Sequence, residues 1–167
     1  MDTQKRTKLL STQMLWLFLL TITFQLGCDS FNPPPCTSTT NPTDEQIKYC
    51  RAVMYINPDV EITPLGHCHD IGFQDDVIHF KFKVIAKDTS SIFQPKFVSP
   101  DEMVQREPMT PPRYGLVDQW WDAADHLLYG GDFTVPDPKT QGNRGLNIGV
   151  VENSDGSFTV YSSWHET

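Results

Sequence analysis

The spacing of hydrophobic and polar residues differs between parts of the chain. Two stretches have a spacing regular enough to predict a strand and a helix. Over residues 78–84, apolar and polar residues alternate, which predicts a half-buried strand. Over 44–55, apolar residues recur at helical spacing, and Thr43 with Gln46 has the spacing of a capping box. We therefore expect a helix that begins near residue 44 and carries Cys50 on its apolar face.

Two further elements are expected in the second half of the chain. A helix is predicted over 116–128, because its apolar residues fall on one side of a helical projection and Gly130-Gly131 follows it. The β-rich runs 146–151 and 157–164 flank a turn that contains Asp155-Gly156, which predicts a C-terminal β-hairpin. The apolar residues of the predicted helix are Leu116, Val117, Trp120, Trp121, Ala124, Leu127 and Leu128.

The predicted order of elements is helix, strands, helix, hairpin. Residues 60–63 predict a short edge strand, whereas 64–76 and 130–145 read as loops rich in Gly, Pro and Asp. Runs of strands beside helices favour an α+β fold. We expect an antiparallel sheet with two main helices packed on one face.

The first residues of the chain have the pattern of an export signal. A basic segment with Lys5, Arg6 and Lys8 precedes an apolar run that starts at Leu9. Basic residues followed by a short apolar centre and a small residue are typical of a secretory signal peptide.

The end of this signal indicates its type. The run closes on Leu26-Gly27-Cys28 and offers no better pair of small residues for an ordinary signal peptidase. These residues resemble the lipobox of bacterial lipoproteins. The resemblance implies that residues 1–27 are removed, that the Cys28 thiol is diacylated and that the new amino terminus is acylated. The alternative is an uncleaved anchor, because about 20 residues can span a bilayer. Either alternative places the rest of the chain outside the cytoplasm.

The remaining chain divides into a tether and a domain. Residues 28–42 contain Pro33-Pro34-Pro35 among Ser, Thr and Asn, a composition that favours an extended polyproline II tether behind the lipidated cysteine. Residues 43–167 are then expected to form a single globular domain. We expect it in the cell envelope, anchored to the membrane and facing the periplasm or the exterior.

Charge excludes one class of partner. Residues 1–27 hold one of the 21 acids and three of the 13 Lys and Arg, so residues 28–167 carry 20 against 10, a net charge of −10. Such a surface repels nucleic acid phosphates. The expected partners are the membrane, through the lipid, and an unspecified envelope protein or small ligand.

The cysteines suggest a disulfide, because export permits one. If Cys28 carries lipid, three cysteines remain and one is unpaired; otherwise four cysteines allow three pairings. We predict the bridge Cys50–Cys68, because Cys50 faces the core and Cys68 shortly precedes the strand at 78–84. Cys36 receives no role.

One cluster is a candidate metal site. His67, His69, Asp70 and His79 supply imidazole and carboxylate groups that suit zinc or copper. The structural alternative is a loop held by a Cys68 disulfide, with exposed histidines. The chain has no recognised catalytic motif, so the main hypothesis is a non-catalytic binding or envelope-structural module without a cofactor. The alternative hypothesis is an exported metal-binding protein or metal-dependent enzyme that uses this cluster.

Overall fold

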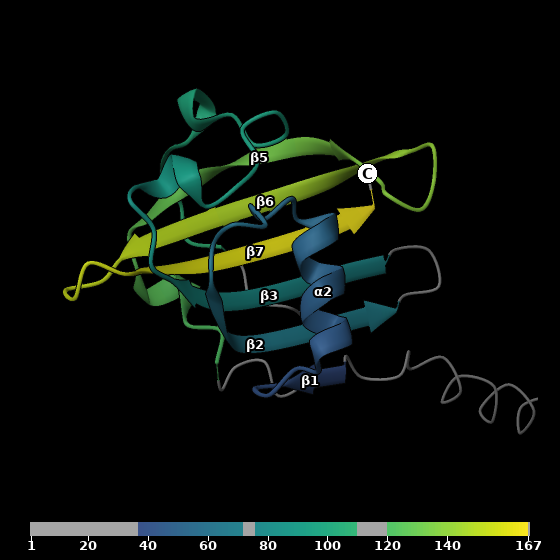
Figure 1. The fold of residues 1–167 in the computed structure, drawn as a ribbon, viewed down its shortest axis with the longest axis horizontal. Coiled ribbons are helices and arrows are strands. Elements are labelled where there is room, and N and C mark those ends of the chain that lie inside the picture. Colours follow the sequence, from purple (N-terminus) through teal and green to yellow (C-terminus); the bar gives the residue numbers. More distant parts are fainter. Residues whose placement is uncertain (1–36, 72–75, 110–119, 167) are drawn as a thin grey trace, which may run out of the picture. The chain divides into compact units, whose positions relative to one another are not determined.

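The described part of the chain is mainly β. The computed structural model describes residues 37–71, 76–109 and 120–166, which belong to one compact unit. These residues form one antiparallel sheet in the order β1-β2-β3-β7-β6-β5-β4 (Figure 1). Its strands are β1 (Thr37–Thr39), β2 (Ile62–Ile71), β3 (Asp76–Val84), β4 (Val104–Arg106), β5 (Leu128–Pro136), β6 (Asn143–Glu152) and β7 (Phe158–Glu166).

The helix predicted after Thr43 is confirmed as α2 (Asp44–Val53). The Thr43 side chain accepts from the Gln46 amide, and the Gln46 side chain accepts from the Thr43 amide, so both halves of the capping box are present. The helix lies across β2, β3 and β7 (Figure 1) and buries Cys50 and Val53 against the sheet.

Strand alternation gives the sheet two distinct faces. Ile78, Phe80 and Phe82 of β3 point toward α2 and are completely buried in the main core, which confirms the predicted strand. We call the side that α2 covers the first face and the opposite side the second face. The residues between them, His79 and Lys81, belong to the second face.

The predicted α+β fold with two main helices is wrong, because the second helix does not form within the described residues. Residues 120–122 have no helical structure, Ala123–Asp125 is a short 3-10 helix (η5), and Leu128 already begins β5. Leu127, which the predicted helix would bury, is 70% exposed. Pairing of Leu128–Pro136 with β6 overrides the local helical pattern. Other short 3-10 helices are η2 (Thr89–Ser91) and η3 (Pro100–Glu102).

Two predicted loops are also strands. The stretch after Val60 becomes β2, which β3 pairs throughout and which β1 pairs only at 67–69. Pro64 is tolerated there because it lies beside a register shift, outside the span paired with β1. In β5, a Cβ on Gly130 would lie 1.9 Å from the Ile148 carbonyl oxygen, so this glycine serves a close strand contact rather than a helix end.

The predicted C-terminal hairpin is confirmed. Strands β6 and β7 pair antiparallel from Arg144 and Glu166 to Glu152 and Phe158. Asn153 donates its amide hydrogen to the Ser157 carbonyl oxygen over 2.8 Å, and Gly156 adopts a φ of 78° in the turn. A residue without a Cβ is favoured in that left-handed conformation.

The predicted tether is too long at its C-terminal end. Thr37–Thr39 forms β1 and pairs with β2, and Pro42 is buried. The folded domain therefore includes at least residues 37–42, which the composition assigned to an extended linker. Pairing with β2 outweighs the loop-like composition of this short edge strand.

Candidate functional site

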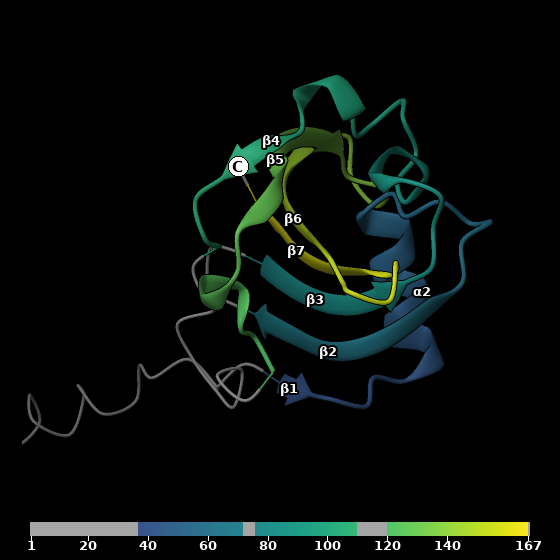
Figure 2. The same cartoon turned by 90° about the vertical axis from the view of Figure 1, so that its left-hand side faces the viewer.

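The second face is partly covered by a segment that we call the strap, residues 120–128. Trp120, Trp121, Ala123 and Leu128 of the strap are buried together with Cys68 and Tyr161. In Figure 2 the strap, drawn in green, and α2 lie on opposite sides of the sheet. The strap therefore gives the second face a small apolar core of its own.

Four hydrogen bonds fasten the strap to the sheet. Trp120 donates its indole hydrogen to Ser38 Oγ of β1 over 2.9 Å. Lys81 Nζ donates to the Trp120 carbonyl oxygen over 2.9 Å and to Asp122 Oδ1 over 2.6 Å. The Tyr161 hydroxyl donates to the same Asp122 oxygen over 2.5 Å. Strands β1, β3 and β7 thus all hold the strap.

Gly66 shows how closely the strap approaches the sheet. A Cβ at this position would lie 2.2 Å from two ring carbons of Trp120. The indole therefore packs directly on the backbone of β2, where only a glycine leaves room for it.

Burial and hydrogen bonding shift the pKa values of Asp122 and Tyr161 beneath the strap. Burial alone would raise the pKa of Asp122, but hydrogen bonds from Lys81 and Tyr161 outweigh burial, so its pKa lies below the ordinary value. Burial and the bond to Asp122 raise the pKa of Tyr161. Lys81 is 8% exposed and its Nζ lies 5.1 Å from the centre of the Tyr161 ring. A protonated tyrosine and a lysine engaged with two acceptors are poorly suited to act as a base or a nucleophile.

Two polar atoms beside this network have no hydrogen-bond partner among the residues that the structure describes. They are Nδ1 of His79 and Nε1 of Trp121, whose side chains meet edge to face with ring centroids 5.3 Å apart. His79 is 8% exposed and Trp121 is 5% exposed. Burial, and then the neighbouring His165 and His67, lower the pKa of His79 to about 4, so its imidazole is neutral at pH 7.

Polar residues continue from His79 across the second face. Ser163, Asn147 and Asp132 occupy successive register positions on β7, β6 and β5. We call the row His79, Ser163, Asn147 and Asp132 the polar strip. Its exposure increases along the row, because His79 and Ser163 are buried, Asn147 is half-buried and Asp132 is exposed. The strip thus runs from exposed Asp132 to buried His79, whose ring contacts that of Trp121.

On the first face, Nδ1 of His67 and Nε1 of Trp164 likewise lack partners within the described residues. Their register partners on β3 are the core residues Phe80 and Ile78, so both side chains project toward α2. No row of polar residues comparable to the polar strip leads to them among the described residues of that face. The second face is therefore the better candidate for a binding site.

The predicted metal site is wrong because its four residues do not converge. His67 and His69 point to the first face, whereas Asp70 and His79 point to the second. His69 instead pairs with Asp76, the first residue of β3. Among the described residues, no three His, Cys, Asp or Glu side chains come close enough to hold a metal ion. The sequence alternation was sufficient to predict the split once 67–70 is recognised as strand.

The predicted Cys50–Cys68 bridge is also wrong. Cys50 is a free, buried thiol in the core of the first face. Cys68 is disulfide-bonded and belongs to the core of the second face. The sheet separates the two side chains, which no argument from sequence distance reveals.

The remaining predicted site residue, Cys28, lies outside the described residues, as do Cys36 and the signal 1–27. Within the part of the chain that the structure describes, no helix is long and apolar enough to span a membrane. The lipid anchor therefore stays a prediction.

Sequence reasoning missed Lys81 and Tyr161, and it assigned Asp122 to the exposed side of a helix. Lys81 alternates with apolar residues as a solvent-facing lysine would, so its pattern contains no sign of burial. The adjacent Trp120-Trp121 pair was the available signal that something covers the second face.

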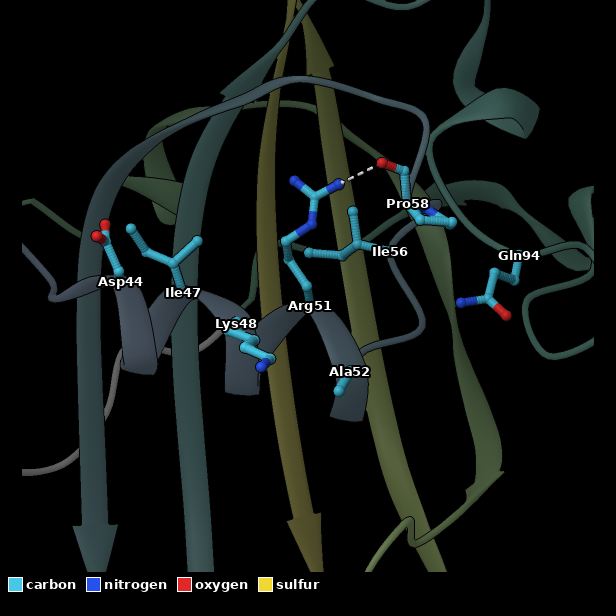
Figure 3. A pocket seen from close by; sticks show the side chains of 8 residues that line it. All are labelled: Asp44, Ile47, Lys48, Arg51, Ala52, Ile56, Pro58 and Gln94. Atoms are coloured by element: carbon cyan, nitrogen blue, oxygen red, sulfur yellow. Dashed lines mark hydrogen bonds between the residues drawn. The ribbon is translucent and has the colours of Figure 1, made fainter.

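A shallow pocket on the outer side of α2 is a weaker candidate. Figure 3 shows Arg51 directed from the helix toward Pro58. The guanidinium donates to the carbonyl oxygens of Asn57, Pro58 and Val60 over 3.0, 3.1 and 2.8 Å. This cation fixes the loop after α2, so we assign no ligand to the pocket. Its lining residues are Asp44, Ile47, Lys48, Arg51, Ala52, Ile56, Pro58 and Gln94.

Comparisons of this chain with protein-family models, with curated proteins and with solved structures found no match.

Proposed function

We propose that this chain is an exported, lipid-anchored and non-catalytic binding module, and that it binds a small ligand between the strap and the polar strip. The observation that carries the site is the contact between His79 and Trp121, whose Nδ1 and Nε1 atoms are buried without partners in the described part of the chain. Native proteins rarely leave buried polar atoms unpaired, so each such atom calls for an explanation.

The free-energy cost of burying these two unpaired atoms favours a ligand that binds them. A buried polar group without a partner costs about 1–3 kcal/mol. A ligand that accepts a hydrogen bond from Trp121 Nε1 and pairs with His79 Nδ1 would recover this cost. Both atoms are closed to solvent, so the strap must shift for the ligand to enter.

The ligand is expected to be uncharged. His79 is neutral at pH 7 because burial lowers its pKa to about 4. The cation of Lys81 is already satisfied by Asp122 and the Trp120 carbonyl. A buried charge on the ligand would therefore find no counter-charge and would cost several kcal/mol. A neutral molecule with hydrogen-bond acceptors and donors, such as a sugar or an amide, fits these groups.

The proposed compartment rests on separate evidence. The disulfide at Cys68 supports an oxidising environment, which the export signal in residues 1–27 would provide. The net charge of −10 over residues 28–167 favours a role away from nucleic acid.

The site is tested by nuclear magnetic resonance of the mature protein in detergent, labelled with ¹⁵N at tryptophan. Removal of residues 1–27 leaves three indoles, at 120, 121 and 164. We expect neutral sugars or amides from a panel to move the Trp121 indole resonance and leave that of Trp164 unchanged. Trp121→Phe and Trp164→Phe assign the signals. If no compound selectively moves the Trp121 signal, the proposed site is wrong.

The anchor is tested by mass spectrometry of the mature protein from membranes. We expect Cys28 to be the first residue and to carry acyl chains, because one chain anchors marginally and two or more anchor stably. Cys28→Ala should leave an uncleaved precursor. A mature terminus at another residue, without lipid, would contradict the anchor.

A further inference from the structure

The second face contains a disulfide whose partner follows from the other cysteines. Cys68 is disulfide-bonded, and Cys50, the other cysteine among the described residues, is a free thiol. The chain has four cysteines, so an intramolecular partner is Cys28 or Cys36. The proposed acylation of Cys28 consumes its sulfur, and on that proposed function the partner is Cys36.

The register of β1 gives independent support. Ser38 pairs directly with Cys68, and its hydroxyl accepts from Trp120 of the strap, so both residues belong to the second face. Cys36 stands two residues before Ser38 in the sequence, a separation that an extended chain spans in at most roughly 7 Å.

We propose that Cys36 and Cys68 form a disulfide. In forming it, the two thiols lose two protons and two electrons. The electrons pass by thiol–disulfide exchange to a disulfide-bonded oxidant of the export compartment, which is reduced to two thiols.

The bridge sets how far the domain stands from the membrane. With Cys28 acylated, residues 29–35 are the whole connection between the lipid and the bridge. Eight steps of an extended chain span at most roughly 26–29 Å. The proposed bridge and anchor together therefore hold Cys68 within about 3 nm of the lipid.

The chain offers a direct test by digestion without reductant. The mature protein is extracted from membranes, denatured, alkylated and cut by an endoprotease that cleaves before Asp. The products 29–43, 44–58 and 59–69 each contain one cysteine: Cys36, Cys50 and Cys68. We expect 29–43 joined to 59–69, and 44–58 alkylated. A missed cut before Asp29 adds the mass of acylated Cys28 to the first product and leaves the assignment intact.

The outcomes separate the bridge from the anchor. Linkage of 59–69 to Cys28 overturns both the bridge and the lipid. An alkylated Cys36 beside an acylated Cys28 overturns the bridge alone, as does a link between two copies of 59–69. An intact Cys36–Cys68 link beside an unmodified Cys28 overturns the anchor alone.

A pair of variants completes the test. Cys36→Ser should make Cys68 alkylatable in every molecule, a readout that does not depend on retained folding. Cys50→Ala, the matched control, should leave the 29–43 to 59–69 link in place. If Cys68 remains bridged in Cys36→Ser, the proposal is wrong.

Discussion

The two faces of the sheet are built from the same strands and held by different forces. The first face is closed by α2 and by a continuous apolar core that includes Phe80, Phe82 and Leu146. The second face is closed by the strap, with a smaller apolar cluster and a network of Lys81, Asp122 and Tyr161. Hydrophobic burial is non-directional, whereas each hydrogen bond in the strap depends on one geometry.

This difference shows that a strand in which apolar and polar residues alternate can be buried on both faces. In β3, Phe80 and Lys81 are neighbours that point to opposite faces, yet both are buried. An apolar face can be buried by any apolar surface that packs on it, because hydrophobic burial is non-directional. The second face is closed although Nδ1 of His79 and Nε1 of Trp121 have no partner among the described residues. We therefore expect the larger share of stability from the first face and keep the proposed ligand site on the second.

The largest expected effect is on the first face. Phe80→Ala removes a completely buried ring and should lower the free energy of unfolding by ~3–5 kcal/mol. Urea denaturation of the variant measures this loss. Ile85→Ala is the matched control, because Ile85 is 83% exposed one residue beyond β3 and should cost less than about 0.5 kcal/mol. Equal costs for the two variants would mean that the first face is not the main core.

Each face contains one histidine whose burial predicts acid sensitivity. Burial lowers the pKa of His67 and of His79 to about 4, with smaller contributions from His69 for the former and His165 for the latter. The unfolded chain binds these protons near pH 6.5 and the folded chain does so only near pH 4. Stability should therefore fall as the pH falls from about 6.5 to about 4, by on the order of 3 kcal/mol per histidine.

Single variants separate the two faces in this pH window. Urea denaturation at pH 7, 5.5 and 4 of His67→Phe and His79→Phe should show that each loses less stability on acidification than the parent protein. The slope of stability against pH near 5 should fall by about one proton in each variant. A parental slope in His79→Phe would mean that this histidine is charged in the folded protein.

The sequence predicted the first face better than the second. The capping box at Thr43, the alternation at Ile78–Val84 and the hairpin turn at Gly156 are local signals, and each corresponds to an observed element. The apolar residues Trp120, Trp121 and Leu128 were predicted to be buried, and they are. Their secondary structure was wrong, because apolar spacing over nine residues fits a strap on a sheet as well as a helix.

The candidate site needed the register of strands far apart in the sequence. Lys81, Asp122 and Tyr161 meet only because β3 pairs with β7 and the strap returns over both. The proposed cluster at 67–70 failed for a local reason, because this stretch was read as a loop and its residues alternate between the two faces as a strand. Local pattern therefore predicted the burial of Trp120, Trp121 and Leu128, but it did not predict the burial of Lys81 or which side chains meet.

A third prediction compares two lysines of one strand. Lys81 and Lys83 pair with Asp122 and Asp155 at 2.6 and 2.7 Å, but their side chains are 10% and 40% exposed. Lys81→Met should cost about 1–2 kcal/mol, because it removes two partly buried hydrogen bonds. Lys83→Met should cost less than about 1 kcal/mol, because solvent screens the exposed pair. Thermal and urea unfolding measure both. Equal costs would show that the strap gains nothing from burial of its ion pair.

The smallest expected effect distinguishes the two adjacent indoles of the strap. Trp120 Nε1 donates to Ser38, whereas Trp121 Nε1 is buried without a partner. Trp120→Phe removes a satisfied hydrogen bond and leaves the Ser38 hydroxyl without its donor, which should cost about 0.5–1.5 kcal/mol beyond the loss of ring volume. Trp121→Phe removes a similar ring volume, but it also removes an unpaired N–H whose burial costs about 1–3 kcal/mol. These two contributions oppose each other, so the net change should stay within about 1 kcal/mol of zero. Urea denaturation without ligand should therefore rank Trp120→Phe as the less stable variant. If Trp121→Phe is instead the less stable one, its Nε1 has a partner in solution, such as an ordered water, and the energetic argument for a ligand beside His79 loses its basis.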